Sequence, residues 1–447
     1  MGHKQGMQRL IAKGWKKGLV IFAGLVLFHI TFSILLSIIA RSSFLSSLHN
    51  GQGLWNFTLD SFVYHDEAVR LLELFRDGDY AGWWQSSPWW HVKWIGLSYA
   101  VLTPDPLSYA PINGLTWAVS VACIFMTVRQ IFPDRRKLAT ACALMFGLWP
   151  SYLLHTSQLL KDPLYIMGMS MMFWGCVNLL SGQRTIISVF LIVFGVLIAY
   201  LNRTYMLEPL IFLSLLAAIF GIWQARGGWV QAVLAVLLIV GLGVYGYTQR
   251  PEIQIQSLSE VHGYDNRLSQ PQEEILSRSQ DSSSSPLIRL VNRGVIKIAY
   301  FRERYIRKYP NAGTNIDTDV HFYSLADILA YVPRASIIGF LAPFPSHWIG
   351  VARTAGRASR ILAGLEMMVW YILLPGFVYF LFSGTVAPHI RIWMLVYTLT
   401  LVVLTSLVVT NIGALYRLRY VYFLPILIGG LEGWARLWFR KFQKFAD

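Results

Sequence analysis

Apolar segments long enough to cross a membrane alternate with short polar segments along most of the chain. A hydrocarbon core of about 30 Å needs roughly 20 mainly apolar residues in a helix. Segments of this kind follow one another in two groups, which a long polar region separates. The predicted spans are residues 18–40, 112–132, 138–156, 164–180, 186–201, 207–223, 230–247, 362–382, 393–409 and 421–434. The pattern predicts an all-α polytopic membrane protein, a bundle of about ten transmembrane helices.

Two long polar regions interrupt this pattern. The first contains an apolar piece at 94–103 that is too short to span, so we expect it to lie at the membrane interface. The second contains a basic amphipathic stretch at 289–308, and a proline-interrupted apolar segment at 323–350 that predicts a broken or re-entrant helix. The expected organisation is a single integral membrane domain at 1–447, with a first outer loop at 41–111, a large outer loop at 248–360 and C-terminal transmembrane helices at 361–447.

Basic residues mark the ends of the spans that we expect in the cytoplasm. They precede the first span, follow the second at 135–137, directly after Asp134, and follow the last at 436–444. By the positive-inside rule, the two long polar regions then face the opposite side. A mean hydropathy of +0.48 and a hydrophobic fraction of 55% exclude an ordinary soluble domain. The net charge of +15 is therefore assigned to cytoplasmic loops, and no nucleic-acid partner is expected.

An acidic pair in the first outer loop is the first candidate for chemistry. Asp66 and Glu67 precede apolar residues at positions 68, 71, 72 and 75, a spacing that predicts an amphipathic helix along the membrane surface. At the N-terminal end of such a helix, the two acids have two interpretations. They are partners of the helix dipole, or one of them is a general base that takes a proton from an attacking hydroxyl or amine.

A second acid and several cations are expected on the same side of the membrane. Asp162, between Lys161 and Pro163, either starts a helix or contributes to a site. Cations at the outer ends of apolar segments either anchor the helices by snorkelling or bind phosphate. The substrate-binding candidates are His91, Lys93, Lys161, Arg203, Arg417 and Arg419.

Aromatic residues and missing motifs narrow the choice further. Trp83, Trp84, Trp89 and Trp90 predict an interfacial belt, with stacking on a sugar ring as the alternative. The chain has no glycine-rich phosphate loop and no His-Glu-x-x-His motif. Nucleotide hydrolysis and zinc proteolysis are therefore not expected.

These residues resemble the motifs of the GT-C superfamily of polytopic glycosyltransferases. Its members use polyprenyl-phosphate-linked sugars and include the protein O-mannosyltransferases and the lipid A aminoarabinose transferase. The matching segments are Asp66-Glu67, Gly78-Asp79-Tyr80, Pro88 to Lys93 and Lys161-Asp162-Pro163. The resemblance covers residues 18–205 and is loose thereafter, although the segment from Tyr416 to Tyr420 resembles bacterial polysaccharide-assembly relatives.

The resemblance implies an inverting hexosyl- or pentosyltransferase in a bacterial inner membrane, with its active site facing the periplasm. Asp66, beside Glu67, would be the base that activates the acceptor. Asp162 would help to hold the acceptor or a metal, which makes a divalent cation a possible cofactor. The cations would bind the lipid phosphate. The implied partners are a polyprenyl-phosphate-linked sugar donor, a lipid or glycan acceptor and membrane lipids.

Two other functions remain open. A polysaccharide polymerase or ligase would use a lipid-diphosphate donor, and the large basic outer loop would suit a polymer acceptor. A transporter of lipid-linked sugars would line its pathway with the same charges. Against a transporter, the candidate residues gather on one face instead of at the midplane, and the chain shows no inverted repeat.

Overall fold

The computed structural model describes most of the chain as helix. The described residues are 2–87, 89–182, 186–223, 241, 286–308, 310, 313–349, 356–384 and 386–443. Within these ranges the secondary structure is helical apart from isolated bridges between His49 and Trp55 and between Asn315 and Asn411. The chain divides into two compact units, 1–239 with 354–356, and 240–353 with 357–447. Each unit is described by itself below.

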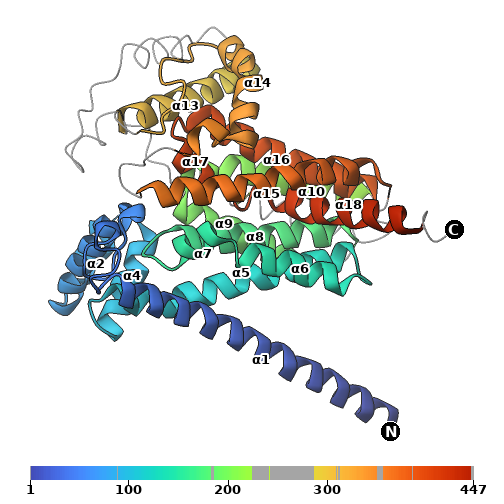
Figure 1. Cartoon of the computed structure of the whole chain (residues 1–447), viewed down its shortest axis with the longest axis horizontal. Coiled ribbons are helices and arrows are strands. Elements are labelled where there is room, and N and C mark those ends of the chain that lie inside the picture. The colour runs from blue at the N-terminus through green and yellow to red at the C-terminus, as the bar shows by residue number, and fades with distance from the viewer. Residues whose placement is uncertain are drawn as a thin grey trace. The chain divides into compact units, whose positions relative to one another are not determined.

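Unit 1 is built around α8. Its helices are α1 (Gly2–Ile39), α2 (Asp60–Arg76), α3 (Tyr80–Ser86), α4 (Trp90–Val101), α5 (Ala110–Ile131), α6 (Arg136–Gly147), α7 (Pro150–Thr156), α8 (Asp162–Leu180), α9 (Ile186–Asn202) and α10 (Leu207–Trp223). Helix α8 packs against α5, α9 and α10, while α5 also packs against α1 and α6 (Figure 1). Helices α2 and α4 pack against each other in the first outer loop.

Glycine allows α8 and α9 to approach closely. A Cβ atom on Gly168 would lie 2.7 Å from the carbonyl oxygen of Gly195, and one on Gly195 would lie 2.5 Å from the carbonyl oxygen of Gly168. Side chains at these positions would push the two backbones apart. Small residues at such a crossing are typical of helices that associate within a membrane.

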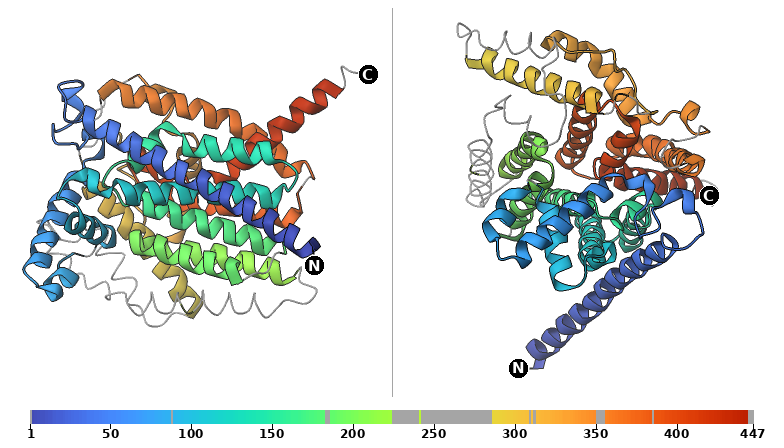
Figure 2. Two further views of the ribbon diagram at one scale, coloured as in Figure 1. Left: turned by 90° about the horizontal axis from the view of Figure 1, so that it is seen from below. Right: turned by 90° about the vertical axis from the view of Figure 1, so that its left-hand side faces the viewer.

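Unit 2 contains α13 (Pro286–Lys308), α14 (Leu325–Leu341), α15 (Gly356–Phe382), α16 (Pro388–Val408), α17 (Ile412–Leu418) and α18 (Leu424–Gln443). Helix α16 packs against α13, α14 and α18 (Figure 2). A capping box starts α14, because Ser324 and Asp327 each accept a hydrogen bond from the other's backbone. Helix α14 ends at Leu341, and a short 3-10 turn, Pro345–His347, follows it.

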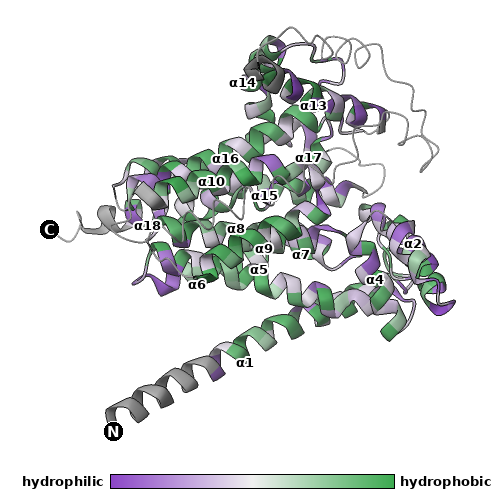
Figure 3. Cartoon of the chain, turned by 180° about the vertical axis from the view of Figure 1, so that it is seen from behind, coloured by the Kyte–Doolittle hydropathy of each residue, from purple (hydrophilic) through white to green (hydrophobic). Residues whose placement is uncertain are grey.

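The described helices confirm an all-α membrane protein. Six are long and apolar enough to cross a membrane: Lys16–Ile39, Pro106–Ile131, Asp162–Leu180, Thr204–Gly221, Arg357–Phe382 and Pro388–Val408. Each coincides with a predicted span. Figure 3 shows apolar residues along α1, α5 and α8, and hydrophilic residues on α2 and α13. By length and composition, these helices are able to cross a membrane.

The predicted number of about ten spans is not confirmed. The span expected at 138–156 is two helices, α6 and α7, bent by 58°. Pro150 begins α7 and forces Trp149 out of the helical region, which explains the break. Helix α9, with 17 residues, is apolar but too short to be among the candidate spans. The prediction at 230–247 lies outside the described residues except for Gly241, and α18 carries Glu432 and Arg436 and is not among the candidate spans.

Candidate functional site

Asp66 and Glu67 lie in the middle of α2. The prediction that they stand at the N-terminal end of a helix is wrong, because α2 begins six residues earlier at Asp60. A 3-10 turn, Asn56–Thr58, leads directly into α2, and Ser61 and Tyr64 extend its buried face toward the N-terminus. The predicted apolar face itself is confirmed, since Ala68, Leu71 and Leu72 are buried. Partnership with the helix dipole therefore no longer explains the acidic pair.

The two acids have different surroundings. Glu67 is held by Arg70, whose Nη2 atom lies 2.6 Å from Oε1 of Glu67, and Arg70 also donates a hydrogen bond to the carbonyl oxygen of Ser86. Asp66 is exposed on the surface of α2. Of the two carboxylates, that of Asp66 is the more accessible to an incoming molecule.

A hydrogen bond beside Asp66 was not predicted from the sequence. Nδ1 of His65 lies 2.7 Å from the hydroxyl of Tyr99 on α4. Burial, reinforced by the charges of Asp105 and Asp66, raises the pKa of Tyr99, so this hydroxyl stays protonated; the tautomer of His65 sets which of the two groups donates. Burial also lowers the pKa of His65 against the opposing effect of the two acids. No periodicity signals this pair, because it joins residues on two helices.

Asp162 and Arg203 form a buried ion pair. Nη2 of Arg203 lies 2.7 Å from Oδ1 of Asp162, and the two residues are only 4% and 2% exposed. Asp162 occupies the first residue of α8, where the helix dipole favours a negative charge. Arg203 also donates to the hydroxyl of Tyr205 at 2.9 Å, and its guanidinium lies 4.8 Å from the ring centre of Tyr165. Snorkelling toward water does not describe Arg203, because its side chain is enclosed.

His91 joins this pair from α4. It is buried, and its ring lies 4.3 Å from that of Tyr64 in an edge-on contact. Burial holds the pKa of His91 well below its usual value; Lys161 and Arg203 lower it further, and Asp162 opposes them. Four predicted residues are thus brought together, and we call this set the Asp162 cluster: His91, Lys161, Asp162 and Arg203. The sequence did not point to Tyr64, Tyr165 or Tyr205 as their neighbours.

Lys93 is enclosed by tryptophans. Its Nζ atom lies 4.7 Å from the ring centre of Trp84, 5.2 Å from that of Trp90 and 5.7 Å from that of Trp83, and it donates to the carbonyl oxygen of Trp84. Burial lowers the pKa of Lys93. These contacts give three of the predicted interfacial tryptophans a second role as a cage around a cation.

Arg417 and Arg419 belong to unit 2. The guanidinium of Arg419 is buried, and it donates to the carbonyl oxygens of Gly339 at 2.7 Å and of Ala342. It also lies about 5 Å from the rings of Tyr416 and Phe423. Arg419 therefore holds the end of α14, while its predicted role in phosphate binding stays a prediction.

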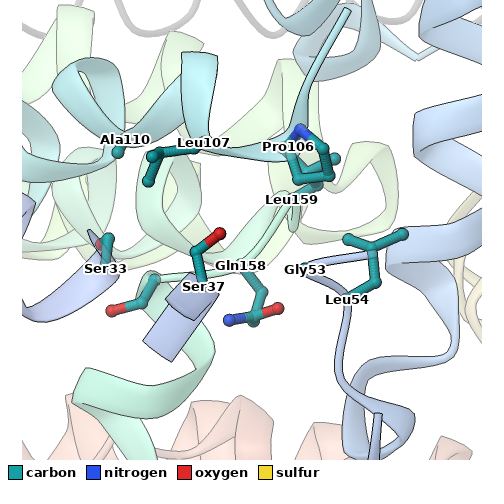
Figure 4. Close-up of a pocket in the computed structure, with 10 residues that line it drawn as sticks. Ser33, Ser37, Gly53, Leu54, Pro106, Leu107, Ala110, Gln158 and Leu159 are labelled. Atoms are coloured by element: carbon teal, nitrogen blue, oxygen red, sulfur yellow. The ribbon is translucent and has the colours of Figure 1, made fainter. Parts of the chain in front are cut away.

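A small recess lies beside the segment that leads into the Asp162 cluster. Figure 4 shows the residues that line it, which are Ser33, Ser37, Gly53, Leu54, Pro106, Leu107, Ala110, Ser157, Gln158 and Leu159. The side chain of Asn113 donates to the carbonyl oxygen of Gln158 at 2.9 Å and so fixes this segment against α5. The lining is uncharged, and the space is about that of a single water molecule, too small for a substrate.

The possible divalent cation finds no site in the described part of the chain. No three His, Cys, Asp or Glu side chains converge there as they do around a bound metal.

Comparisons with family models, with curated proteins and with solved structures found no match to this chain. The described helices establish its class as an all-α membrane protein.

The buried His91 predicts a pH dependence of stability. The folded protein keeps His91 neutral because its pKa is lowered, whereas the unfolded chain takes up a proton below about pH 6.5. The unfolded state then binds more protons, so His91 should cost roughly 1.4 kcal/mol of stability per pH unit below that value. Thermal midpoints measured in detergent at pH 7.5 and 5.0 should fall more for the wild type than for His91→Asn. An equal fall in both proteins would show that His91 does not titrate in this way.

Proposed function

We propose that this protein is an inverting glycosyltransferase that moves a sugar from a polyprenyl-phosphate-linked donor to an acceptor at the outer face of a bacterial inner membrane. The proposal rests on the resemblance of residues 18–205 to polytopic glycosyltransferases. The observation that carries it is the different environment of the two acids, because Glu67 is engaged by Arg70 while Asp66 is exposed on a surface helix.

Asp66 acts as the general base in this proposal. A carboxylate that activates a hydroxyl has to reach it within hydrogen-bond distance, and an exposed side chain on α2 is open to such an acceptor. The acceptor oxygen attacks the anomeric carbon, its proton passes to Asp66, and the bond from that carbon to the phosphate oxygen breaks. The phosphate leaves as an anion and needs no acid to protonate it. One carboxylate is then sufficient, in contrast to glycoside hydrolysis with its two carboxylates.

The Asp162 cluster binds the phosphate in this proposal. Within the cluster, Asp162 is paired with Arg203 and His91 is neutral, so Lys161 is the further cation of the set. Lys161 is the partly exposed member of the cluster, so it is the cation that meets a singly charged phosphodiester and the charge that develops on the leaving group. The buried ion pair of Arg203 with Asp162 fixes the start of α8 beside it. Lys93 has a different part, which is to support the tryptophans of α3 and α4.

A transfer assay tests the proposed function. Purified protein in lipid nanodiscs is given a polyprenyl-monophosphate sugar and a mixture of membrane lipids and glycans as acceptors. We expect a new glycoside and an equal amount of free polyprenyl phosphate. Transfer only from a diphosphate donor would indicate a polymerase or ligase instead.

A further inference from the structure

Helix α13 carries a stripe of basic side chains. Arg293, Lys297, Arg304 and Arg307 recur at intervals of four, seven and three residues, which places them on one face of the helix. The three arginines are exposed, and Lys297 is half-buried. We call these four residues the basic stripe. It belongs to unit 2 and is independent of the proposed transferase site in unit 1.

The opposite face of α13 is fixed to unit 2. Val295, Ala299 and Arg302 are buried there. The guanidinium of Arg302 donates to three backbone carbonyl oxygens, those of Asp317 at 2.6 Å, Val320 at 2.8 Å and Leu407 at 2.9 Å. A buried arginine with three acceptors holds the helix in one rotation. The basic stripe is therefore presented outward by a rigid support.

The acid of α13 does not offset the stripe. Glu303 is the one acidic residue in the sequence of this helix, and it is buried with its carboxylate bonded to Nδ1 of His321. The exposed positions of α13 therefore include basic residues and no acidic residue of the same helix. Such a surface attracts an extended anionic partner and not a single counterion.

The position of α13 relative to the end of a membrane-spanning helix indicates which anionic partner it meets. Arg302 bonds to Leu407, which lies one residue before the end of the membrane-spanning helix α16 at Val408. Figure 1 shows α13 beside α14, close to α17, which follows α16 in the chain. The end of a spanning helix lies at the level of the phospholipid headgroups. A basic amphipathic helix at this depth meets the headgroup layer before any soluble polyanion.

We propose that the basic stripe of α13 docks on the headgroups of anionic phospholipids. The lipid phosphates bind the three exposed arginines, and the apolar side of the helix stays packed on α14 and α16. Docking at this point ties unit 2 to membranes rich in anionic lipid. The lipid headgroups attract the stripe by its charge near an anionic surface, where lysine and arginine contribute similarly, so lysine replaces arginine with little loss.

Native mass spectrometry of the full chain tests this proposal. The probe is phosphatidylglycerol mixed with phosphatidylcholine. The triple variant Arg293→Gln, Arg304→Gln and Arg307→Gln should lose affinity for phosphatidylglycerol by on the order of 100-fold. Substitution of the same three residues by lysine should keep it. The matched control is Arg76→Gln, Arg136→Gln and Lys137→Gln, which removes the same charge at exposed positions of α2 and α6 and should bind as the wild type does.

Three results would overturn the proposal. The first is wild-type affinity in the triple glutamine variant, and the second is an equal loss in the matched control, which would reduce the effect to total charge. The third is displacement of phosphatidylglycerol by dextran sulfate at equal phosphate and sulfate concentrations, which would identify a soluble polyanion as the occupant. An unchanged thermal midpoint in both variants establishes that they fold, as expected for exposed positions.

Discussion

Replacement of Asp162 by alanine should lower the free energy of unfolding by about 3–5 kcal/mol, because it leaves the charge of Arg203 buried without its acidic partner. Arg203 is only 4% exposed, so its charge is almost entirely removed from water. The effect is measured as the fall in thermal midpoint of the detergent-solubilised protein. Asp162→Asn should cost less than alanine, since an amide oxygen still accepts a hydrogen bond from the guanidinium.

The ion pair between Glu67 and Arg70 supplies the control. Its nitrogen and oxygen atoms are 2.6 Å apart, close to the 2.7 Å of the buried pair, but the Arg70 side chain is 50% exposed. Glu67→Ala should therefore change stability by no more than about 1 kcal/mol. Similar losses of stability in Asp162→Ala and Glu67→Ala would mean that burial does not make the ion pair of Asp162 more stabilising than the exposed pair.

Asp66→Asn should reduce the rate of sugar transfer by about 100-fold to 10,000-fold, the range that a general base contributes. Asparagine has nearly the same shape but cannot take up the proton of the acceptor. Because Asp66 is exposed on α2, the variant should keep the thermal midpoint of the wild type. The measurement is the rate of product formation from a polyprenyl-monophosphate sugar.

Two neighbouring acids test the assignment to Asp66. Glu67→Gln and Asp60→Asn remove a carboxylate from the same helix, one residue after and six residues before Asp66. Both should retain most of the transfer rate. A large loss in Glu67→Gln with a small loss in Asp66→Asn would transfer the role of base to Glu67.

The membrane spans could be predicted from the sequence to the extent that length and hydropathy define them. Six predicted spans coincide with long apolar helices because a continuous apolar run has few alternatives. The segment at 138–156 has the length of a span, yet its bend depends on how Pro150 and Trp149 redirect the backbone. The predicted start of α2 was too late. Ser61 and Tyr64 belong to its buried face, but neither is a clearly apolar residue, so the hydropathy pattern did not include them.

The sequence predicted which residues belong to the candidate site, but not which of them contact one another. The sequence placed Asp162 and Arg203 on one side of the membrane, but their ion pair joins residues 41 positions apart and depends on the packing of α8 against α9. The burial of His91 and the tryptophan cage of Lys93 likewise depend on contacts within the first outer loop and with the start of α8. From the sequence alone, a charged or titratable residue is expected to be exposed. Only the packing of the folded chain shows that such a residue is buried.

Transfer of a labelled sugar from a polyprenyl-monophosphate donor by the purified wild-type protein tests the central claim most directly. The account predicts a glycoside whose anomeric configuration is opposite to that of the donor, with one polyprenyl phosphate released for each sugar transferred. Movement of the intact donor across a proteoliposome membrane, with its sugar–phosphate bond unbroken and no glycoside formed, would contradict it.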